Sequence, residues 1–141
     1  MVAVAQKSKI LAAGIAAALT IALMAALATQ PAAAITTQTV NWQITLKAAN
    51  SFPTATGSAQ YQAQPGQREL QMELEHLTKL AGQNVTFYAN GAKFGVAKVS
   101  SKGIVQIDRN TELGQSVPLI VHGSTVAART STGVLIASGR F

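Results

Sequence analysis

The sequence predicts an all-β protein: an antiparallel β-sandwich of about eight strands and immunoglobulin-like size, with a barrel as the alternative. Two observations predict it. After residue 34, apolar and polar residues alternate with a period of two over much of the chain, and turn residues interrupt this alternation roughly every 8–12 positions. No segment there has a convincing period of 3.6, so helices are not expected. The sandwich is predicted to be a single domain, residues 35–141.

The first two predicted strands are residues 40–46 and 55–62. Trp42 is expected in the core between the sheets, because the residues that share its face are aliphatic (Val40, Ile44 and Leu46). The second segment alternates small or aromatic residues with Thr, Ser and Gln. Gln64-Pro65-Gly66-Gln67 then predicts a turn, because Pro presets φ and Gly accepts a positive φ.

Residues 68–77 are predicted to form a strand, although Glu, Leu, Gln and Met also favour helices. In a helix the apolar residues would spread around the axis, whereas in a strand they separate onto one face. That face is predicted to carry Leu70, Met72, Leu74 and His76, and the opposite face Glu69, Gln71, Glu73 and Glu75.

The second half of the chain predicts two hairpins. Residues 84–89 and 92–99 flank Asn90-Gly91, a strong signal for a two-residue hairpin turn. Residues 125–130 and 134–138 flank Thr132-Gly133 in the same way. Between the hairpins we expect a strand at residues 104–109, a polar connection at 110–117 and a short apolar run at Leu119-Ile120-Val121.

Residues 1–34 have the three-part pattern of a secretory signal peptide. Lys7 and Lys9 form a positive start, residues 10–28 are uncharged and mostly apolar, and small residues suited to a peptidase follow Pro31 (Ala32-Ala33-Ala34). Cleavage after Ala34 would give a secreted or periplasmic protein. The alternative is a membrane anchor formed by residues 10–28, because 19 uncharged residues nearly span a bilayer.

Composition excludes several kinds of site. The chain has no Cys, so disulfides, thiolate metal sites and Cys nucleophiles are excluded. His76 and His122 are the only histidines and Asp108 is the only Asp, which leaves too few ligands for a three-His zinc site. No Gly-rich phosphate loop is present. We therefore expect no metal and no cofactor.

The predicted mature chain is mildly basic. Without Lys7 and Lys9, nine basic and five acidic residues give a formal charge of +4. This charge favours anionic neighbours such as an envelope polymer. The second half holds several cations, and Lys on an edge strand guards against edge-to-edge pairing (Lys93, Lys98, Lys102, Arg109 and Arg129). Nucleic-acid binding is not expected, because the nearby aromatic residues alternate between faces (Phe87, Tyr88 and Phe94).

Two groups of residues could support catalysis, and neither forms a recognisable motif. His76 and Asp108 could form a cryptic hydrolase site, but we interpret His76 as a half-buried residue at a strand end, since no second group is spaced to help it. His122 is expected in an exposed turn. The carboxylates of Glu69, Glu73 and Glu75 indicate a solvated face rather than a glycosidase pair. We assign no catalytic residue.

One segment carries a family resemblance. Ala55-Thr56-Gly57-Ser58-Ala59-Gln60-Tyr61 is followed, after the Pro-Gly turn, by Arg68-Glu69-Leu70-Gln71-Met72-Glu73-Leu74-Glu75-His76-Leu77. This run, residues 55–77, resembles the CHRD type of secreted domain. That family carries a His-x-His motif in its next strand, and residues 85–91 here contain no His, so the role of those histidines does not transfer. The mature chain also resembles uncharacterised secreted bacterial β-sandwich proteins. Both resemblances imply a β-sandwich outside the cytoplasm, and neither implies an activity.

These observations predict a non-enzymatic domain with a binding or structural role at the cell surface or in the periplasm. Its partner would be an anionic envelope polymer, another protein or a second copy of the chain, bound through loops or an exposed strand edge. Residues 35–39 could donate a strand to a neighbour. The alternatives are a small secreted hydrolase with a site near His76, or the same binding domain held to a membrane by residues 10–28.

Overall fold

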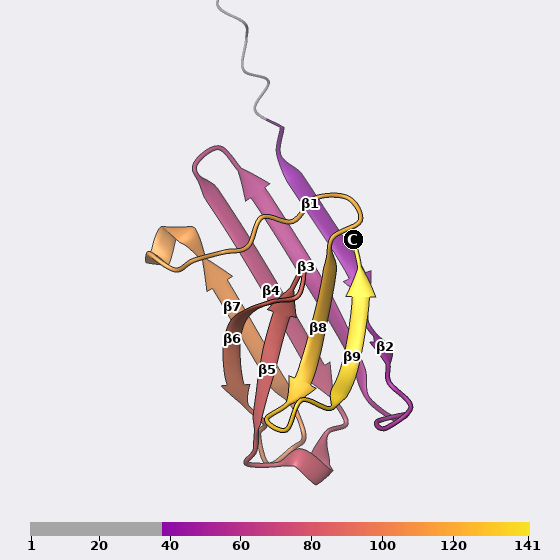
Figure 1. Cartoon of the computed structure of the whole chain (residues 1–141). Helices are drawn as coiled ribbons and strands as arrows, with labels where there is room; N and C mark the ends of the chain where they lie inside the picture. The colour runs from indigo at the N-terminus through magenta and orange to yellow at the C-terminus, as the bar shows by residue number, and fades with distance from the viewer. Residues whose placement is uncertain (1–37) are drawn as a thin grey trace, which may run out of the picture. The chain divides into compact units, whose positions relative to one another are not determined.

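The computed structural model describes residues 38–141, which form nine β-strands and two short 3-10 turns (Figure 1). The predicted signal peptide, its cleavage point after Ala34 and the alternative anchor at residues 10–28 lie outside the described residues. In chain order the elements are β1 (Val40–Thr45), β2 (Lys47–Ala48), β3 (Thr56–Gln64), β4 (Gln67–Glu75), η1 (Thr78–Leu80), β5 (Asn84–Ala89), β6 (Ala92–Lys98), β7 (Val105–Asn110), η2 (Thr111–Leu113), β8 (Thr125–Thr130) and β9 (Leu135–Arg140).

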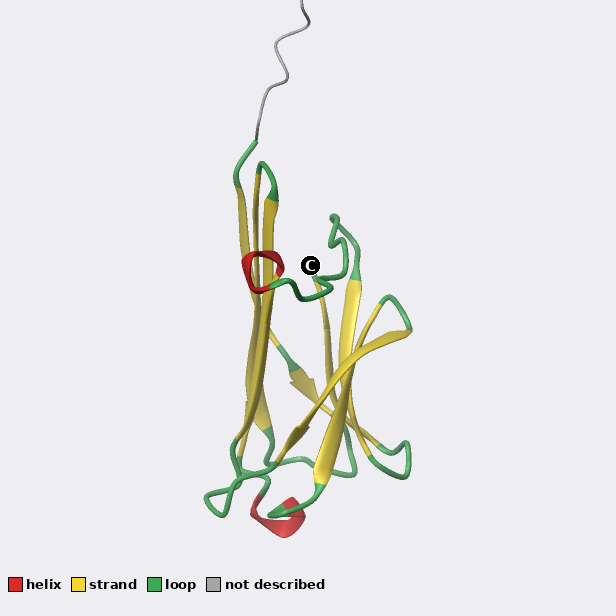
Figure 2. Ribbon diagram, turned by 90° about the vertical axis from the view of Figure 1, so that its left-hand side faces the viewer, coloured by secondary structure: helices red, strands yellow, loops and turns green. Residues whose placement is uncertain are grey.

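The strands form two antiparallel sheets that lie face to face as two layers (Figure 2). One sheet has the order β1-β3-β4-β7 and the other the order β2-β9-β8-β5-β6. The predicted β-sandwich is therefore confirmed. Over residues 38–141 the two sheets stay separate, so the alternative of a closed barrel is wrong.

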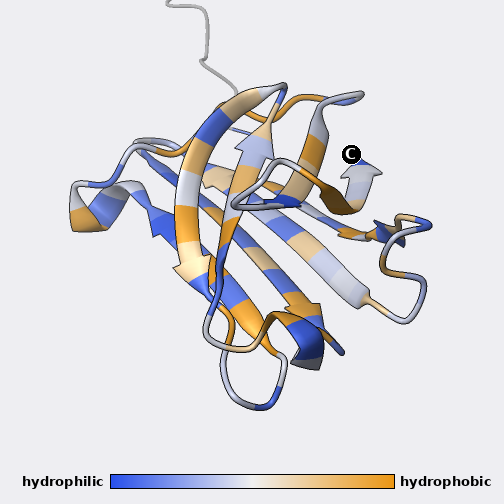
Figure 3. Cartoon of the chain, turned by 60° about the horizontal axis from the view of Figure 1, so that its bottom comes forward, coloured by the Kyte–Doolittle hydropathy of each residue, from blue (hydrophilic) through white to orange (hydrophobic). Residues whose placement is uncertain are grey.

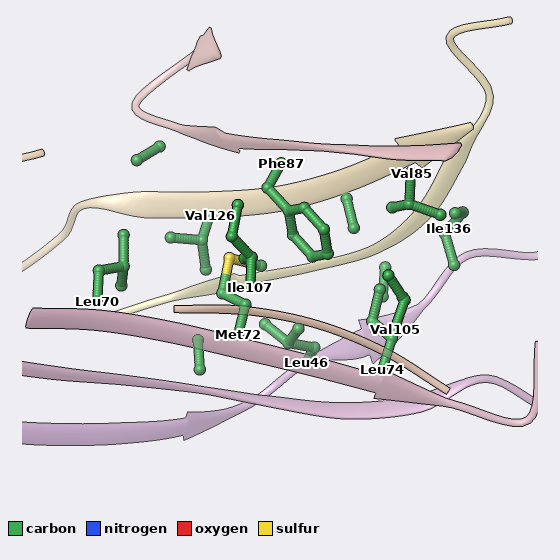
Figure 4. Close-up of a cluster of buried hydrophobic side chains, with 14 of the residues drawn as sticks. Leu46, Leu70, Met72, Leu74, Val85, Phe87, Val105, Ile107, Val126 and Ile136 are labelled. Atoms are coloured by element: carbon green, nitrogen blue, oxygen red, sulfur yellow. The ribbon is translucent and has the colours of Figure 1, made fainter. Parts of the chain in front are cut away.

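The alternation of apolar and polar residues in the sequence separates the side chains that face the interior from those that face solvent. Apolar and polar residues alternate along the strands (Figure 3), and the apolar members point between the layers (Figure 4). The four-stranded sheet contributes Leu70, Met72, Leu74, Val105 and Ile107, and these face Val85, Phe87, Val126 and Ile136 of the other sheet. A dry core of this kind is the main stabilising term in a domain without disulfides.

The chain changes sheets at the end of the first predicted strand. Residues up to Thr45 pair with β3, and Lys47 already pairs with β9 of the other sheet. Leu46, at the crossing, is 4% exposed and donates its N–H to the carbonyl of Gly57 at 2.9 Å. The strand predicted at residues 40–46 is present as β1, and β2 is a further short strand that the sequence does not predict.

Both predicted hairpins are present, and their turn residues have the required backbone. Asn90 and Gly91 have φ of 49° and 79°, the pair of positive values that a two-residue type I′ turn needs. Gly133 in the second hairpin has φ of 88°, and Gly66 after Pro65 has φ of 77°. Glycine serves at these positions because a Cβ is unfavourable there.

His76 differs from its prediction. The sequence predicts it on the apolar face of a strand that runs to Leu77, but β4 ends at Glu75. His76 then adopts φ of 62° and is exposed, and Leu77 takes the buried position at 2% exposure. The alternation is broken because the left-handed residue turns the chain toward the other sheet.

The short apolar run at residues 119–121 lies outside the strands, and Leu119 and Val121 are 62% and 54% exposed around the buried Ile120. Trp42 faces the interior as predicted, but it is half-buried. Its ring lies 6.1 Å from that of Tyr61 and 6.3 Å from that of Phe141, between centroids.

Candidate functional site

The outer face of the five-stranded sheet is basic. The register places five cations on this face, one or two from each of four strands, namely Lys47, Lys93, Lys98, Arg129 and Arg140. The five strands contain no Asp and no Glu, so no carboxylate within the sheet neutralises them. The result is an extended surface of a single charge sign.

A hollow lies within this basic face. Its volume is about 300 Å³, and its lining includes Tyr88, Thr125, Ala127 and Arg129. Tyr88 is the aromatic residue of the hollow: Lys93 lies directly opposite it on β6, and Ala127 lies opposite it on β8. The small side chain of Ala127 leaves the flank of the half-buried Tyr88 uncovered.

Arg129 is held in a defined position at this hollow. Its Nη1 donates to the carbonyl oxygen of Gly133 at 3.0 Å, in the turn between β8 and β9. The bond ties the guanidinium to the hairpin, and a guanidinium has further N–H donors for an anionic ligand. Arg129 therefore presents a preorganised positive charge beside Tyr88.

The aromatic cluster noted in the sequence separates as the alternation predicts. Phe87 is fully buried, and its ring lies 6.3 Å from that of Phe94, between centroids. The register between β5 and β6 shifts after Phe87, so Phe94 is an extra residue in β6 and packs against the core. Tyr88 alone of the three belongs to the outer face.

Two of the basic residues named from the sequence lie elsewhere. Lys102 is in the turn between β6 and β7, and Arg109 of β7 alternates with outward-facing residues and lies beside Gly95. Conversely, Lys47 and Arg140 join the basic face, although the sequence does not indicate them as part of its basic second half. The place of Lys47 depends on the pairing of β2 with β9, which no local pattern reveals, and Arg140 lies beyond the strand predicted at residues 134–138.

The outer face of the four-stranded sheet is acidic. It carries four of the five acidic residues of the chain, namely Glu69, Glu73, Glu75 and Asp108. Its other outward positions are Gln, Asn, Ser or Thr. The only cations in these strands, Arg68 and Arg109, fall on the inward-facing positions of the alternation. The face expected to be solvated is thus a polar sheet surface with negative charge.

His76 lines a different and smaller hollow. Its volume is about 150 Å³, and Ser51, Thr78 and Lys79 are among its lining residues. The Nδ1 atom of His76 lies 2.9 Å from Oγ1 of Thr56. Asp108 is not part of this hollow: it pairs with Gln71, five residues before His76, which corresponds to about 17 Å along a strand. The structure therefore does not bring His76 and Asp108 together.

His122 is exposed, as predicted, and precedes Gly123, whose φ is 90°. Among residues 38–141, no three His, Cys, Asp or Glu side chains are grouped closely enough to hold a metal ion. Within the same residues, no helix has the length and apolar character needed to cross a membrane.

Comparisons with known proteins add no assignment. No family model, no curated protein and no solved structure matches the chain. The resemblance to the CHRD type of domain therefore rests on residues 55–77 alone, and the basic face with its hollow at Tyr88 is the candidate functional site.

Proposed function

We propose that the chain is a non-enzymatic binding domain that works outside the cytoplasm and takes an anionic polymer on its basic face. The observation that carries the proposal is the segregation of charge: five cations and no carboxylate on one exposed sheet face. A polymer suits such a surface because repeated weak contacts along its length add together.

The two parts of the site have different roles. The cations supply long-range attraction, which raises the encounter rate and weakens with salt. Tyr88 supplies an apolar ring surface with a polar tip, on which a sugar ring of the polymer can lie. The Arg129 guanidinium beside it favours carboxylate, sulfate or phosphate groups through paired hydrogen bonds. The chemistry fits an acidic polysaccharide of the cell envelope.

Export is the second half of the proposal and rests on residues 1–34, whose pattern is that of a signal peptide. The measurement is the intact mass of the chain in the extracellular, periplasmic and membrane fractions. Loss of residues 1–34 supports secretion. A full-length mass confined to the membrane fraction would favour an anchor at residues 10–28 instead.

Binding is tested with dextran sulfate, using uncharged dextran as the matched polymer. The variant Lys93→Gln/Lys98→Gln removes two cations from the basic face. It should weaken binding by about 30-fold, because each cation near an anionic surface contributes about 1 kcal/mol. The control Lys79→Gln/Lys102→Gln makes the same charge change in η1 and in the β6–β7 turn, off the sheet face. Equal losses in both variants, or equal binding of both polymers, would refute a specific basic face.

A small hydrolase remains the alternative, and it would need the hollow at His76. Asp108 lies too far away to orient the imidazole, so any partner would come from the lining residues, such as Ser51, Thr78 or Lys79. His76→Ala would then abolish turnover of a substrate without changing the unfolding curve. Absence of turnover across a substrate panel would remove this alternative.

A further inference from the structure

The two outer faces of the sandwich have opposite charge. The four-stranded sheet presents Glu69, Glu73, Glu75 and Asp108, and the five-stranded sheet presents Lys47, Lys93, Lys98, Arg129 and Arg140. The two sets therefore count four negative and five positive charges. Because the faces are the two outsides of one sandwich, the core separates them, and the charges of one face cannot pair with those of the other in the same molecule (Figure 2).

The acidic charges have no partner on their own face either. The cross-strand neighbours of Glu69 are Gln62 and Asn110, and those of Glu73 are Ser58 and Gln106. Asp108 of β7 pairs with Gln71 of β4, and Glu75 pairs with Thr56 of β3. The closest polar contact of these carboxylates is a hydrogen bond from Nδ2 of Asn110 to Oε2 of Glu69, at 3.4 Å. Each carboxylate thus stands among neutral side chains and is available to an external cation.

We infer that the acidic face of one molecule docks on the basic face of a second copy of this chain. The inference rests on the proposed function, in that the same basic face takes an anionic partner, and it identifies one such partner in the chain itself. Charge complementarity selects this pairing. Docking two acidic faces or two basic faces against each other would place like charges together, which is unfavourable.

The arrangement of the faces sets the kind of assembly. A contact between two different surfaces of identical chains is heterologous, and it closes into a ring only if successive copies rotate back to the start. The two faces here lie on opposite sides of the molecule, so each added copy leaves a free face of each sign. The expected product is an open stack that grows by addition at both ends.

The chemistry of the two faces determines how strong the contact between copies is. The acidic face has no apolar side chain among its outward positions, so its contact with a second copy is polar and hydrated. Such contacts depend on electrostatics, and salt screens them. The stack is therefore expected to be reversible, and stable only at low ionic strength.

The first experiment is sedimentation velocity of the chain as recovered from cells, at about 20 mM and about 300 mM NaCl, which span Debye lengths of about 20 Å to about 6 Å. At low salt the weight-average mass should rise with concentration to at least about twice that of the monomer. At high salt it should return to the monomer. A monomer at every concentration in low salt, or an oligomer indifferent to salt, overturns the inference.

The second experiment tests the acidic face and the basic face one at a time. The acid variant carries Glu69→Gln, Glu73→Gln and Glu75→Gln, and the base variant carries Lys47→Gln, Lys93→Gln and Lys98→Gln. Each variant alone should stay monomeric, because it lacks one half of the contact. An equimolar mixture should form a 1:1 heterodimer and grow no further, because the acid variant retains the basic face and the base variant retains the acidic face. A mixture that stays monomeric, or a single variant that still stacks, contradicts the inference.

The dextran sulfate measurement keeps the two proposals distinct. The acid variant should bind dextran sulfate as well as the parent chain does and yet fail to stack. For the parent chain, dextran sulfate should dissolve the stacks, since it competes for the same basic face. Dextran sulfate binding without stacking by the parent chain leaves the proposed function standing and removes only this inference. If the parent chain neither binds dextran sulfate nor stacks, the proposed function is refuted as well.

Discussion

Gly95 of β6 lies directly opposite Phe87 of β5, and a Cβ on Gly95 would overlap Cδ1 of Ile107, which belongs to the other sheet. Three consecutive strands, β5, β6 and β7, therefore approach at one point of the core. The same hypothetical Cβ would lie 3.2 Å from Nη2 of Arg109. The absence of a side chain at Gly95 lets β6 and β7 come together where the two sheets meet at one edge.

Gly95→Ala should lower the free energy of unfolding by about 1–3 kcal/mol, as overpacking of a filled core does. Ile107→Val removes the Cδ1 atom that the new methyl group would meet, and alone should cost about 0.5–1.5 kcal/mol. The double variant should lose less than the sum of the two, because the second change relieves the clash created by the first. Urea unfolding of the parent chain, the two single variants and the double variant measures these free energies. Simple additivity would show that residues 95 and 107 do not contact each other as described.

The hydroxyl of Tyr61 provides a second prediction. Tyr61 is 1% exposed, and its Oη atom is buried without a hydrogen-bond partner. Burying an unpaired hydroxyl is unfavourable, so Tyr61→Phe should raise the free energy of unfolding by about 1 kcal/mol. Thermal unfolding measures the change. A clear loss of stability would mean that the hydroxyl has a partner.

Asn90 stabilises its hairpin in two ways that can be separated. Its φ of 49° is unfavourable for most residues, and its Oδ1 accepts a hydrogen bond from the N–H of Thr125 at 3.0 Å. Asn90→Gly keeps the backbone freedom and loses the bond, so it should cost about 1 kcal/mol. Asn90→Ala loses both and should cost about 2–3 kcal/mol. Equal losses in urea unfolding would indicate that backbone strain contributes nothing.

The backbone of His76 predicts an asymmetric response to substitution. Its φ of 62° suits Asn and Gly far better than a β-branched residue, and its side chain is exposed. His76→Asn should change the free energy of unfolding by less than about 0.5 kcal/mol. His76→Val should lower it by about 1–2 kcal/mol. If both variants lose stability equally, the contact between the imidazole and Thr56 is the important one, and the backbone is not.

Much of the fold could be predicted from local patterns. The alternation around Leu70, Met72 and Leu74 identifies both the strand and its buried face, because side chains of a strand point to opposite sides in turn. Asn90-Gly91 identifies its turn, because few other residues accept two successive positive φ values. The position of His76 could not be predicted in this way, since no residue near it indicates that β4 ends at Glu75.

The candidate site could be predicted only in part. The sequence indicated a basic second half and an acidic strand at residues 68–77, but which side chains share a surface depends on strand order. Lys47 comes early in the chain and joins the basic face through β9, and Arg109 belongs to the basic second half of the chain yet falls on the inward side of β7. The pairing of strands that are distant in sequence determines the positions of both side chains.

By itself, the sequence determined the period of two, the hairpin turns and the lack of cysteine, because each is a property of neighbouring residues or of composition. The tertiary structure alone decided that the chain crosses from one sheet to the other at Leu46 and that opposite charges lie on opposite faces. The physical reason is that sheet membership is fixed by hydrogen-bond partners distant in sequence and by the core that both sheets must share.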